Sequence, residues 1–295
     1  LVAFILVSVM RVECAKCSVS VLGDFHGRYI RMPLAKISLF ALFLFFFLLL
    51  TACSTAPKKP LHIEPGDYSH VIEYAKWLIK KEIRKRDLVG LSIAIVDDQE
   101  LVWSSGFGFA SVEDGIKATG DTLYRAGSLS KLLTATAIMR LHEEGRLDID
   151  NSVQTYIPSL KLRSRFTDDN PFTLRQVLSH HSGLPSEYLK GMWSDNAIDF
   201  RDLPALIGGY SNLGVSLLGI TIENTSDSRY EDYIDEIIFD PLEMESSYIG
   251  KSVVPSVLMS EGYRKGKRAA IVDLSLYPAG GLVSSVNDLS QFLKM

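Results

Sequence analysis

The sequence is poor in cysteine. Three cysteines occur among 295 residues, at positions 14, 17 and 53. Cys14 and Cys17 form a single Cys-x-x-Cys pair, and without a second pair this spacing is a weak indication of a zinc or redox site. If the residues before Cys53 are removed from the mature protein, one cysteine remains. A disulfide framework is then excluded, and stability must come from the hydrophobic core.

Strong net charge and metal-ligand patterns are also missing. The formal net charge is −4 at pH 7, which argues against nucleic acid as a partner. His180 and His181 are adjacent, so their side chains would diverge on a helix, and no histidine follows them. A helix-end role is therefore favoured over a metal pair. We expect no metal and no cofactor.

The longest apolar run is too short to cross a membrane. Residues 39–50 are uncharged and apolar, but twelve residues fall short of the roughly 20 that a membrane helix needs. The run follows Arg31 and Lys36, as in a signal peptide. Ala52-Cys53 resembles the end of a bacterial lipoprotein cleavage box, which would make Cys53 the lipidated first residue. A noncleaved membrane helix with an incidental cysteine is the alternative.

The chain divides into four expected parts. Met32 begins a normal signal-peptide pattern, so residues 1–31 are interpreted as an upstream segment outside the true start. Residues 32–52 would be the lipoprotein signal peptide and residues 53–67 a short tether. Residues 68–295 are long enough for one catalytic domain. This organisation predicts a protein of the cell envelope, attached by lipid to a bacterial membrane and outside the cytoplasm.

Hydrophobic periodicity predicts an α+β protein. Apolar residues recur at near-helical intervals over His70–Arg86, with a basic run on the outer side that is interpreted as a solvated face rather than a membrane-binding patch. Leu91–Val96 and Leu101–Trp103 flank a polar turn, which indicates an antiparallel hairpin. Helical patterns then dominate from Ser128 to about Leu242. This order predicts an antiparallel sheet, a helical lobe and a binding cleft between them.

Ser128 and Lys131 stand three residues apart at the start of a helix-like run. A serine hydroxyl is a poor nucleophile at neutral pH and needs a base within hydrogen-bond reach. Residues i and i+3 of a helix share one face, so the spacing predicts that the Lys131 amine reaches the Ser128 oxygen. Unpaired N–H groups of a first helical turn would favour negative charge on that oxygen. The spacing alone occurs by chance, so its meaning depends on neighbouring motifs.

Those motifs occur in order and resemble one enzyme family. The set is similar to the class C β-lactamase-like serine hydrolases, which include class C β-lactamases, penicillin-binding DD-peptidases and related esterases. The resemblance extends from about residue 68 to residue 295. It is carried by Leu123–Lys131, Gly145–Asp150, Leu178–Pro185, Tyr210–Gly214, Pro241–Met244 and Pro278–Leu282.

The resemblance assigns expected roles to four residues. It implies that Ser128 is the acylated nucleophile, Lys131 its base partner and Tyr210 a second acid/base group. Asn212 would hydrogen-bond to the substrate amide. A tyrosine at the start of the second motif favours the class C-like branch over the Ser-Asp-Asn pattern of class A. The expected substrates are β-lactams, D-alanyl peptides of the cell wall or small esters.

Two departures from the family pattern qualify these expectations. The family carries a third motif, Lys-Thr-Gly or His-x-Gly, after the segment Pro278–Leu282, and no such motif follows that segment in this sequence. We therefore interpret the chain as C-terminally truncated, with an incomplete sheet; the alternative function is a catalytically incomplete fragment or a binding protein on the same scaffold. The stretch between Pro185 and Tyr210 is also shorter than usual, which is expected to disturb the position of Tyr210.

Overall fold

The main sheet has the strand order β1-β2-β3, with β3 at Ile116–Lys117, and its first two strands, β1 (Gly90–Asp97) and β2 (Glu100–Ser111), form an antiparallel hairpin. Asp98 and Gln99 form its turn at positive φ angles of 46° and 66°, a backbone that suits a tight hairpin. The hairpin predicted from the sequence is therefore confirmed. The computed structural model describes residues 55–163, 172–186, 193–194, 197–199, 208–249, 254–255, 258–264, 267–269 and 276–295.

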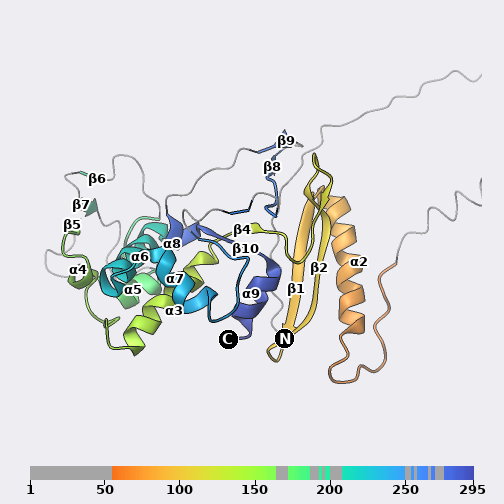
Figure 1. Ribbon diagram of the computed structural model, residues 1–295, viewed down its shortest axis with the longest axis horizontal. Helices are drawn as coiled ribbons and strands as arrows, with labels where there is room; N and C mark the ends of the chain where they lie inside the picture. Colours follow the sequence, from red (N-terminus) through yellow and green to blue (C-terminus); the bar gives the residue numbers. More distant parts are fainter. Residues whose placement is uncertain are drawn as a thin grey trace, which may run out of the picture.

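Helices lie on both sides of the hairpin (Figure 1). The predicted N-terminal helix is present as α2 (Ser69–Arg86) and contacts β2, whereas α9 (Val286–Leu293) contacts β1 and β2. Six consecutive residues of β1, Leu91–Val96, are buried, as in a strand that is covered on both faces. Together with the helical lobe described next, this arrangement confirms the α+β class.

The helical lobe is built around α3 (Ser130–Glu143). This helix contacts α6 (Asn212–Ser226), α7 (Tyr230–Ile234) and the short α8 (Tyr277–Gly280). Its inward positions recur every three or four residues, which is the pattern of an amphipathic helix. These positions and their partners form one continuous core: Leu133, Ala137, Ile138, Leu141, Leu213, Leu217, Leu218, Ile222, Tyr230, Tyr233 and Ile234.

The helix α8 is held between α3 and α6. On one side, the Thr134 hydroxyl of α3 donates to the Pro278 carbonyl at 2.8 Å and lies 2.7 Å from the Tyr230 hydroxyl. On the other side, α6 presents Gly219, where a Cβ atom would lie 2.2 Å from Pro278 Cγ. The missing side chain therefore lets the two helices approach closely, and α8 has little freedom to shift.

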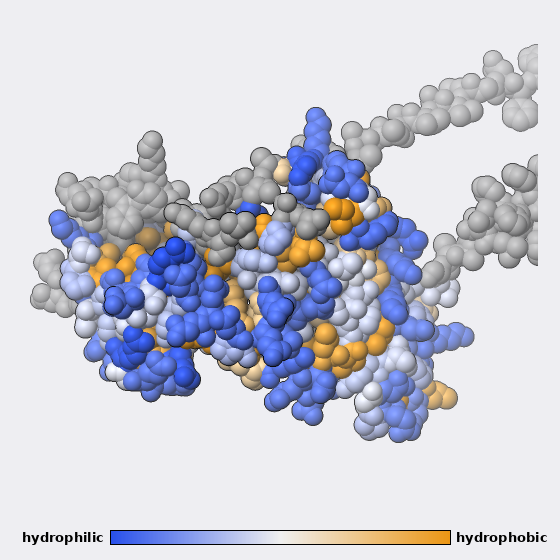
Figure 2. All heavy atoms as spheres, in the orientation of Figure 1, coloured by the Kyte–Doolittle hydropathy of each residue, from blue (hydrophilic) through white to orange (hydrophobic). Residues whose placement is uncertain are grey.

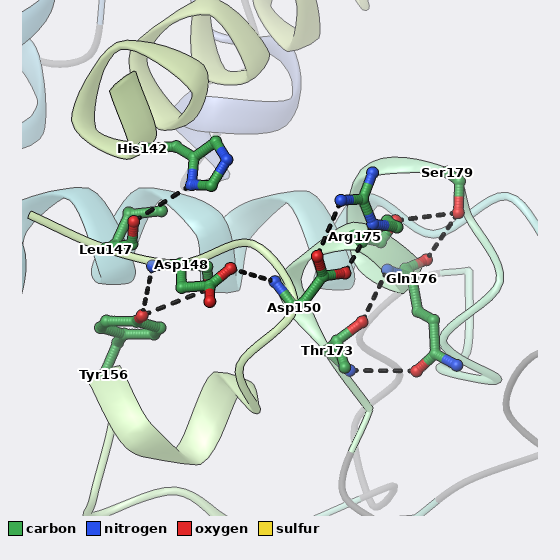
Figure 3. A network of polar contacts seen from close by, with 9 residues as sticks. All are labelled: His142, Leu147, Asp148, Asp150, Tyr156, Thr173, Arg175, Gln176 and Ser179. Atoms are coloured by element: carbon green, nitrogen blue, oxygen red, sulfur yellow. Dashed lines mark hydrogen bonds and ion pairs between the residues drawn. The ribbon is translucent and has the colours of Figure 1, made fainter. Parts of the chain in front are cut away.

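A polar network fixes the short helix α5 (Leu174–Leu178) at the edge of the lobe (Figure 3). Thr173 accepts from the Gln176 N–H, and the Gln176 side chain accepts from the Thr173 N–H, which makes a capping box. Arg175 donates two bonds to Asp150, at 2.6 and 2.9 Å. This pairing lowers the pKa of the Asp150 carboxyl. The network thereby sets the direction in which the chain leaves α5.

Hydrophilic residues cover much of the face shown in Figure 2, with small hydrophobic patches between them. The basic run at the end of α2 is exposed, and Lys81 lies 4.9 Å from the centre of the Trp77 ring. Among the described residues, no helix has the length and apolar character needed to cross a bilayer. The apolar run 39–50 and Cys53 lie outside the described residues.

The remaining elements are short. β4 and β10 pair antiparallel, the order β5-β7-β6 forms a small sheet, and β8 pairs with β9. One turn of π-helix, η1, follows α7 directly. Their bounds are β3 Ile116–Lys117, β4 Tyr124–Gly127, α4 Val153–Tyr156, β5 Lys161–Arg163, β6 Trp193–Ser194, β7 Ala197–Asp199, η1 Asp235–Phe239, β8 Tyr263–Arg264, β9 Lys267–Arg268 and β10 Leu282–Ser284.

Replacing Gly219 by alanine should destabilise the protein. Alanine is the better helix former, but its Cβ would overlap Pro278, and overpacking of this kind costs about 1–3 kcal/mol. The free energy of unfolding, measured with urea, should therefore fall. The control is Ile220→Ala, the exposed neighbour on the same helix, which should change stability much less. An unchanged midpoint for Gly219→Ala would contradict the close packing of α6 on α8.

Candidate active site

Ser128 lies in the turn between β4 and α3. Gly127 ends the strand with a φ of 55°, a conformation that suits glycine, and three residues later the helix begins. The Ser130 hydroxyl is buried; it donates to the Gly127 carbonyl at 2.7 Å and accepts from the Leu282 N–H at 2.9 Å. Ser128 itself is exposed. The turn therefore presents the Ser128 side chain outward from a backbone that is tied to β10.

Lys131 reaches Ser128 as the spacing predicts. Its Nζ donates to the Ser128 Oγ at 3.2 Å and to the Ala279 carbonyl at 2.6 Å. The Ala279 carbonyl belongs to α8, which α3 and α6 hold in place. The lysine nitrogen is thus fixed at two points rather than extended into solvent.

Tyr210 meets Ser128 from the opposite part of the lobe. Its hydroxyl lies 2.8 Å from the Ser128 Oγ, across 82 positions of sequence, and its ring centre lies 4.9 Å from the Lys131 Nζ. The side chain is 48 % exposed, so the hydroxyl pair is open to a ligand. The shorter stretch before Tyr210 does not displace it, and that expectation is wrong. Ser128, Lys131 and Tyr210 form one cluster.

The backbone that carries Tyr210 is anchored at the start of α6. Ser211 caps this helix: its hydroxyl accepts from the Gly214 N–H at 2.9 Å and donates to the Pro185 carbonyl at 2.6 Å. The N–H of Asn212 donates to the Ser186 carbonyl at 2.8 Å. Asn212 is half-buried and lies two residues after Tyr210. Its contact with substrate stays a prediction.

His180 is a member of the site that its sequence position did not reveal. Its ring lies 4.7 Å from the Tyr210 ring, centre to centre, and its Nδ1 accepts from the Ser211 N–H at 3.2 Å. Burial lowers the pKa of His180, and the charges of Lys131 and His181 lower it further. The sequence indicated only a helix end here. Its neighbour His181 instead contacts the Ser179 carbonyl through Nδ1, at 2.8 Å.

The cluster supplies the parts of a nucleophilic site. A hydroxyl nucleophile is in contact with two groups that can exchange a proton with it, an amine and a phenol. Among the residues that the structure describes, no group of three or more His, Cys, Asp or Glu side chains is arranged to hold a metal ion. The chemistry that this arrangement supports is therefore attack by the Ser128 oxygen with local proton transfer.

Comparisons with known proteins show which proteins this chain resembles. Protein flp of Staphylococcus aureus (strain MW2) is 26 % identical over 239 residues, which cover 74 % of this chain and 47 % of flp. The chain spans about half the length of the curated relatives it matches. Among solved structures, an octameric penicillin-binding protein homologue from Pyrococcus abyssi matches with a TM-score of 0.63 and 31 % identity, over 76 % of this chain and 56 % of that one.

A second solved structure matches the fold to a similar extent. The beta-lactamase/D-alanine carboxypeptidase from Pseudomonas syringae matches with a TM-score of 0.64 and 26 % identity, over 73 % of this chain and 62 % of that one. The Beta-lactamase family model matches residues 75–295, which include the turn of Ser128, the start of α6 and α8. By the extent of this match and by its fold, the chain belongs to the beta-lactamase family.

Proposed function

We propose that this protein is a serine hydrolase that forms an acyl-enzyme at Ser128. The observation that carries the proposal is the contact of one exposed hydroxyl with two proton-exchanging groups, Lys131 Nζ at 3.2 Å and Tyr210 OH at 2.8 Å. Two side chains from segments distant in the sequence thus converge on the Ser128 oxygen. Membership of the beta-lactamase family supports the same assignment.

The reaction proceeds in two steps. The Ser128 Oγ attacks the carbonyl carbon of the substrate, and its proton passes to the unprotonated form of Tyr210 or Lys131. The same proton then protonates the leaving nitrogen or oxygen as its bond to the carbonyl carbon breaks. Water subsequently hydrolyses the acyl ester and restores the Ser128 hydroxyl.

The proposed substrates are β-lactams, D-alanyl peptides or small esters. The first two share an amide followed by a carboxylate, and Asn212 is proposed to bind that amide. The name of the Pseudomonas syringae relative combines both activities. The alternative is a penicillin-binding protein without turnover, in which the acyl ester forms but persists.

A fluorescent penicillin should label Ser128. Incubation of the full chain with the probe, followed by peptide mass mapping, should place the adduct on the peptide that contains Ser128, and Ser128→Ala should abolish it. Ser226→Ala, at the opposite end of α6 from Tyr210, is the control and should label normally. Release of the label over time would indicate a hydrolase, and a persistent label the binding alternative. Labelling that survives Ser128→Ala would refute the assignment.

Removing either proton-exchanging group should slow acylation more than it weakens binding. Tyr210→Phe keeps the ring that lies near Lys131 and deletes the hydroxyl, whereas Lys131→Met deletes the amine. General acid–base catalysis contributes about 10²–10⁴-fold, so the acylation rate constant should fall by a factor in this range in each variant. Stopped-flow labelling separates this rate constant from the dissociation constant of the initial complex. If a variant acylates at the wild-type rate, the deleted group has no part in the mechanism.

We further propose that Cys53 is lipidated and holds the enzyme at a bacterial membrane, outside the cytoplasm. The support is the apolar run 39–50 followed by Ala52-Cys53. Metabolic labelling with radioactive palmitate should mark the mature protein, and Cys53→Ser should lose both the label and the membrane association. Ser54→Ala, at the next position of the mature protein, is the control and should keep both. An unlabelled wild-type protein would end the lipoprotein proposal.

A further inference from the structure

His180 is held in an uncommon backbone conformation beside Tyr210. Its φ is 59°, the left-handed conformation of the residue that follows a helix C-cap. The His180 N–H donates to the Val177 carbonyl at 3.0 Å and the His181 N–H donates to the Gln176 carbonyl at 2.7 Å, so a Schellman motif ends α5 and fixes the backbone of His180. This backbone turns the imidazole toward the start of α6, where its ring lies 4.7 Å from the Tyr210 ring with the planes inclined by 35°.

The hydrogen bond to Ser211 requires the uncharged imidazole. The donor is the Ser211 N–H, so Nδ1 must carry a lone pair, and the ring proton of the neutral form is then on Nε2. Among the residues that the structure describes, the charged or titratable groups that face His180 are Lys131 from α3, the adjacent His181, and Tyr210 before α6. Burial first, then Lys131 and His181, lowers the pKa of His180. Near neutral pH the acceptor is therefore intact.

We propose that His180 is a positioning residue, whose neutral imidazole holds the Tyr210 hydroxyl against Ser128 and releases it when the ring is protonated. The proposal rests on the proposed function for its catalytic consequence. It connects two contacts on consecutive residues: the imidazole packs against the Tyr210 ring and accepts from the N–H of the next residue, Ser211. One side chain, that of His180, therefore contacts both the Tyr210 ring and the backbone N–H that follows it.

Acidification should break the hydrogen bond between His180 and Ser211 and thereby lower the acylation rate. Below the pKa of His180 both ring nitrogens carry protons, so an Nδ1–H would face the Ser211 N–H and two donors would oppose each other. The lowered pKa places this change below about pH 6.5, the ordinary value for histidine. Displacement of the Ser211 backbone moves Tyr210, and misplacement by about 1 Å can reduce a rate about 10²-fold. Acylation should therefore lose rate on the acid side.

Two substitutions separate the effect of the hydrogen-bond acceptor of His180 from the effect of its ring. His180→Asn places an amide oxygen where Nδ1 lies, tolerates the left-handed backbone and does not titrate. His180→Phe retains a ring against Tyr210 and has no acceptor. At pH 7.5, the acylation rate constant of the full chain with fluorescent penicillin should fall roughly 10–100-fold in His180→Phe, with the dissociation constant of the initial complex little changed. His180→Asn should recover most of the rate and lose the acid inflection that belongs to His180.

His181→Asn is the matched control, because Nδ1 of His181 contacts the Ser179 carbonyl, whereas Nδ1 of His180 accepts from the Ser211 N–H. It should acylate like the wild type and keep an acid inflection, with the midpoint moved up because the charge of His181 no longer lowers the pKa of His180. A His180→Phe variant with the wild-type rate, or a His180→Asn variant with an unchanged pH profile, would overturn the proposal. Thermal unfolding of each variant checks that a lost rate is not a lost fold.

A second measurement does not depend on activity. In the full chain labelled with ¹³C-histidine and ¹³C-tyrosine, NMR signals of His180 and Tyr210 are assigned by their loss in His180→Asn and Tyr210→Phe. The Tyr210 signal should shift with the same midpoint as His180, and that shift should vanish in His180→Asn. If the two signals titrate independently, the proposal for His180 is overturned, whether or not penicillin labels the protein. If the two signals share a midpoint but penicillin labels nothing, only the proposed function is refuted.

Discussion

The geometry of the site depends on one buried hydroxyl. Ser130 is fully buried, and its Oγ bridges the Gly127 carbonyl and the Leu282 N–H. A buried polar group left without a partner costs about 1–3 kcal/mol. The Ser130 hydroxyl therefore strongly favours the one arrangement in which it joins the end of β4, the start of α3 and β10. Ser128 lies inside the span that the bridge closes. Its position is therefore fixed by a neighbour two residues away that never meets substrate.

From that fixed turn, helix packing brings the other groups to Ser128. Thr134, one turn after Ser130, holds the Pro278 carbonyl, and the next carbonyl of α8, that of Ala279, accepts from Lys131. Gly219 lets α6 approach the same short helix, and Tyr210 immediately precedes α6. The short helix α8 therefore contacts both Lys131 and α6, the helix that follows Tyr210. Displacing it would move the Lys131 nitrogen as well as the helix that follows Tyr210.

The sequence predicted well those features that are local. The helix α2 and the β1–β2 hairpin follow from hydrophobic periodicity, and the Ser128–Lys131 contact follows from helical spacing because both residues belong to one turn. The resemblance to a family predicted the role of Tyr210. Its contact with Ser128 spans 82 positions of sequence, so local periodicity could not predict it. His180 was missed for a related reason: its contact with Tyr210 arises from tertiary structure, whereas its left-handed φ belongs to the helix end that its neighbours in the sequence indicate.

Exposure is divided in a way that suits acyl transfer. Ser128 and Tyr210 are exposed, whereas the hydroxyls that support them, those of Ser130, Thr134 and Ser211, are buried. In the proposed reaction, substrate must reach the Ser128 oxygen and water must later reach the acyl ester, so these oxygens need an open side. Precise placement has the opposite requirement, because a side chain is held best by buried, fully bonded partners. The fold meets both demands by placing the reacting groups at the ends of α3 and α6 and their supports one to six residues away, inside the lobe.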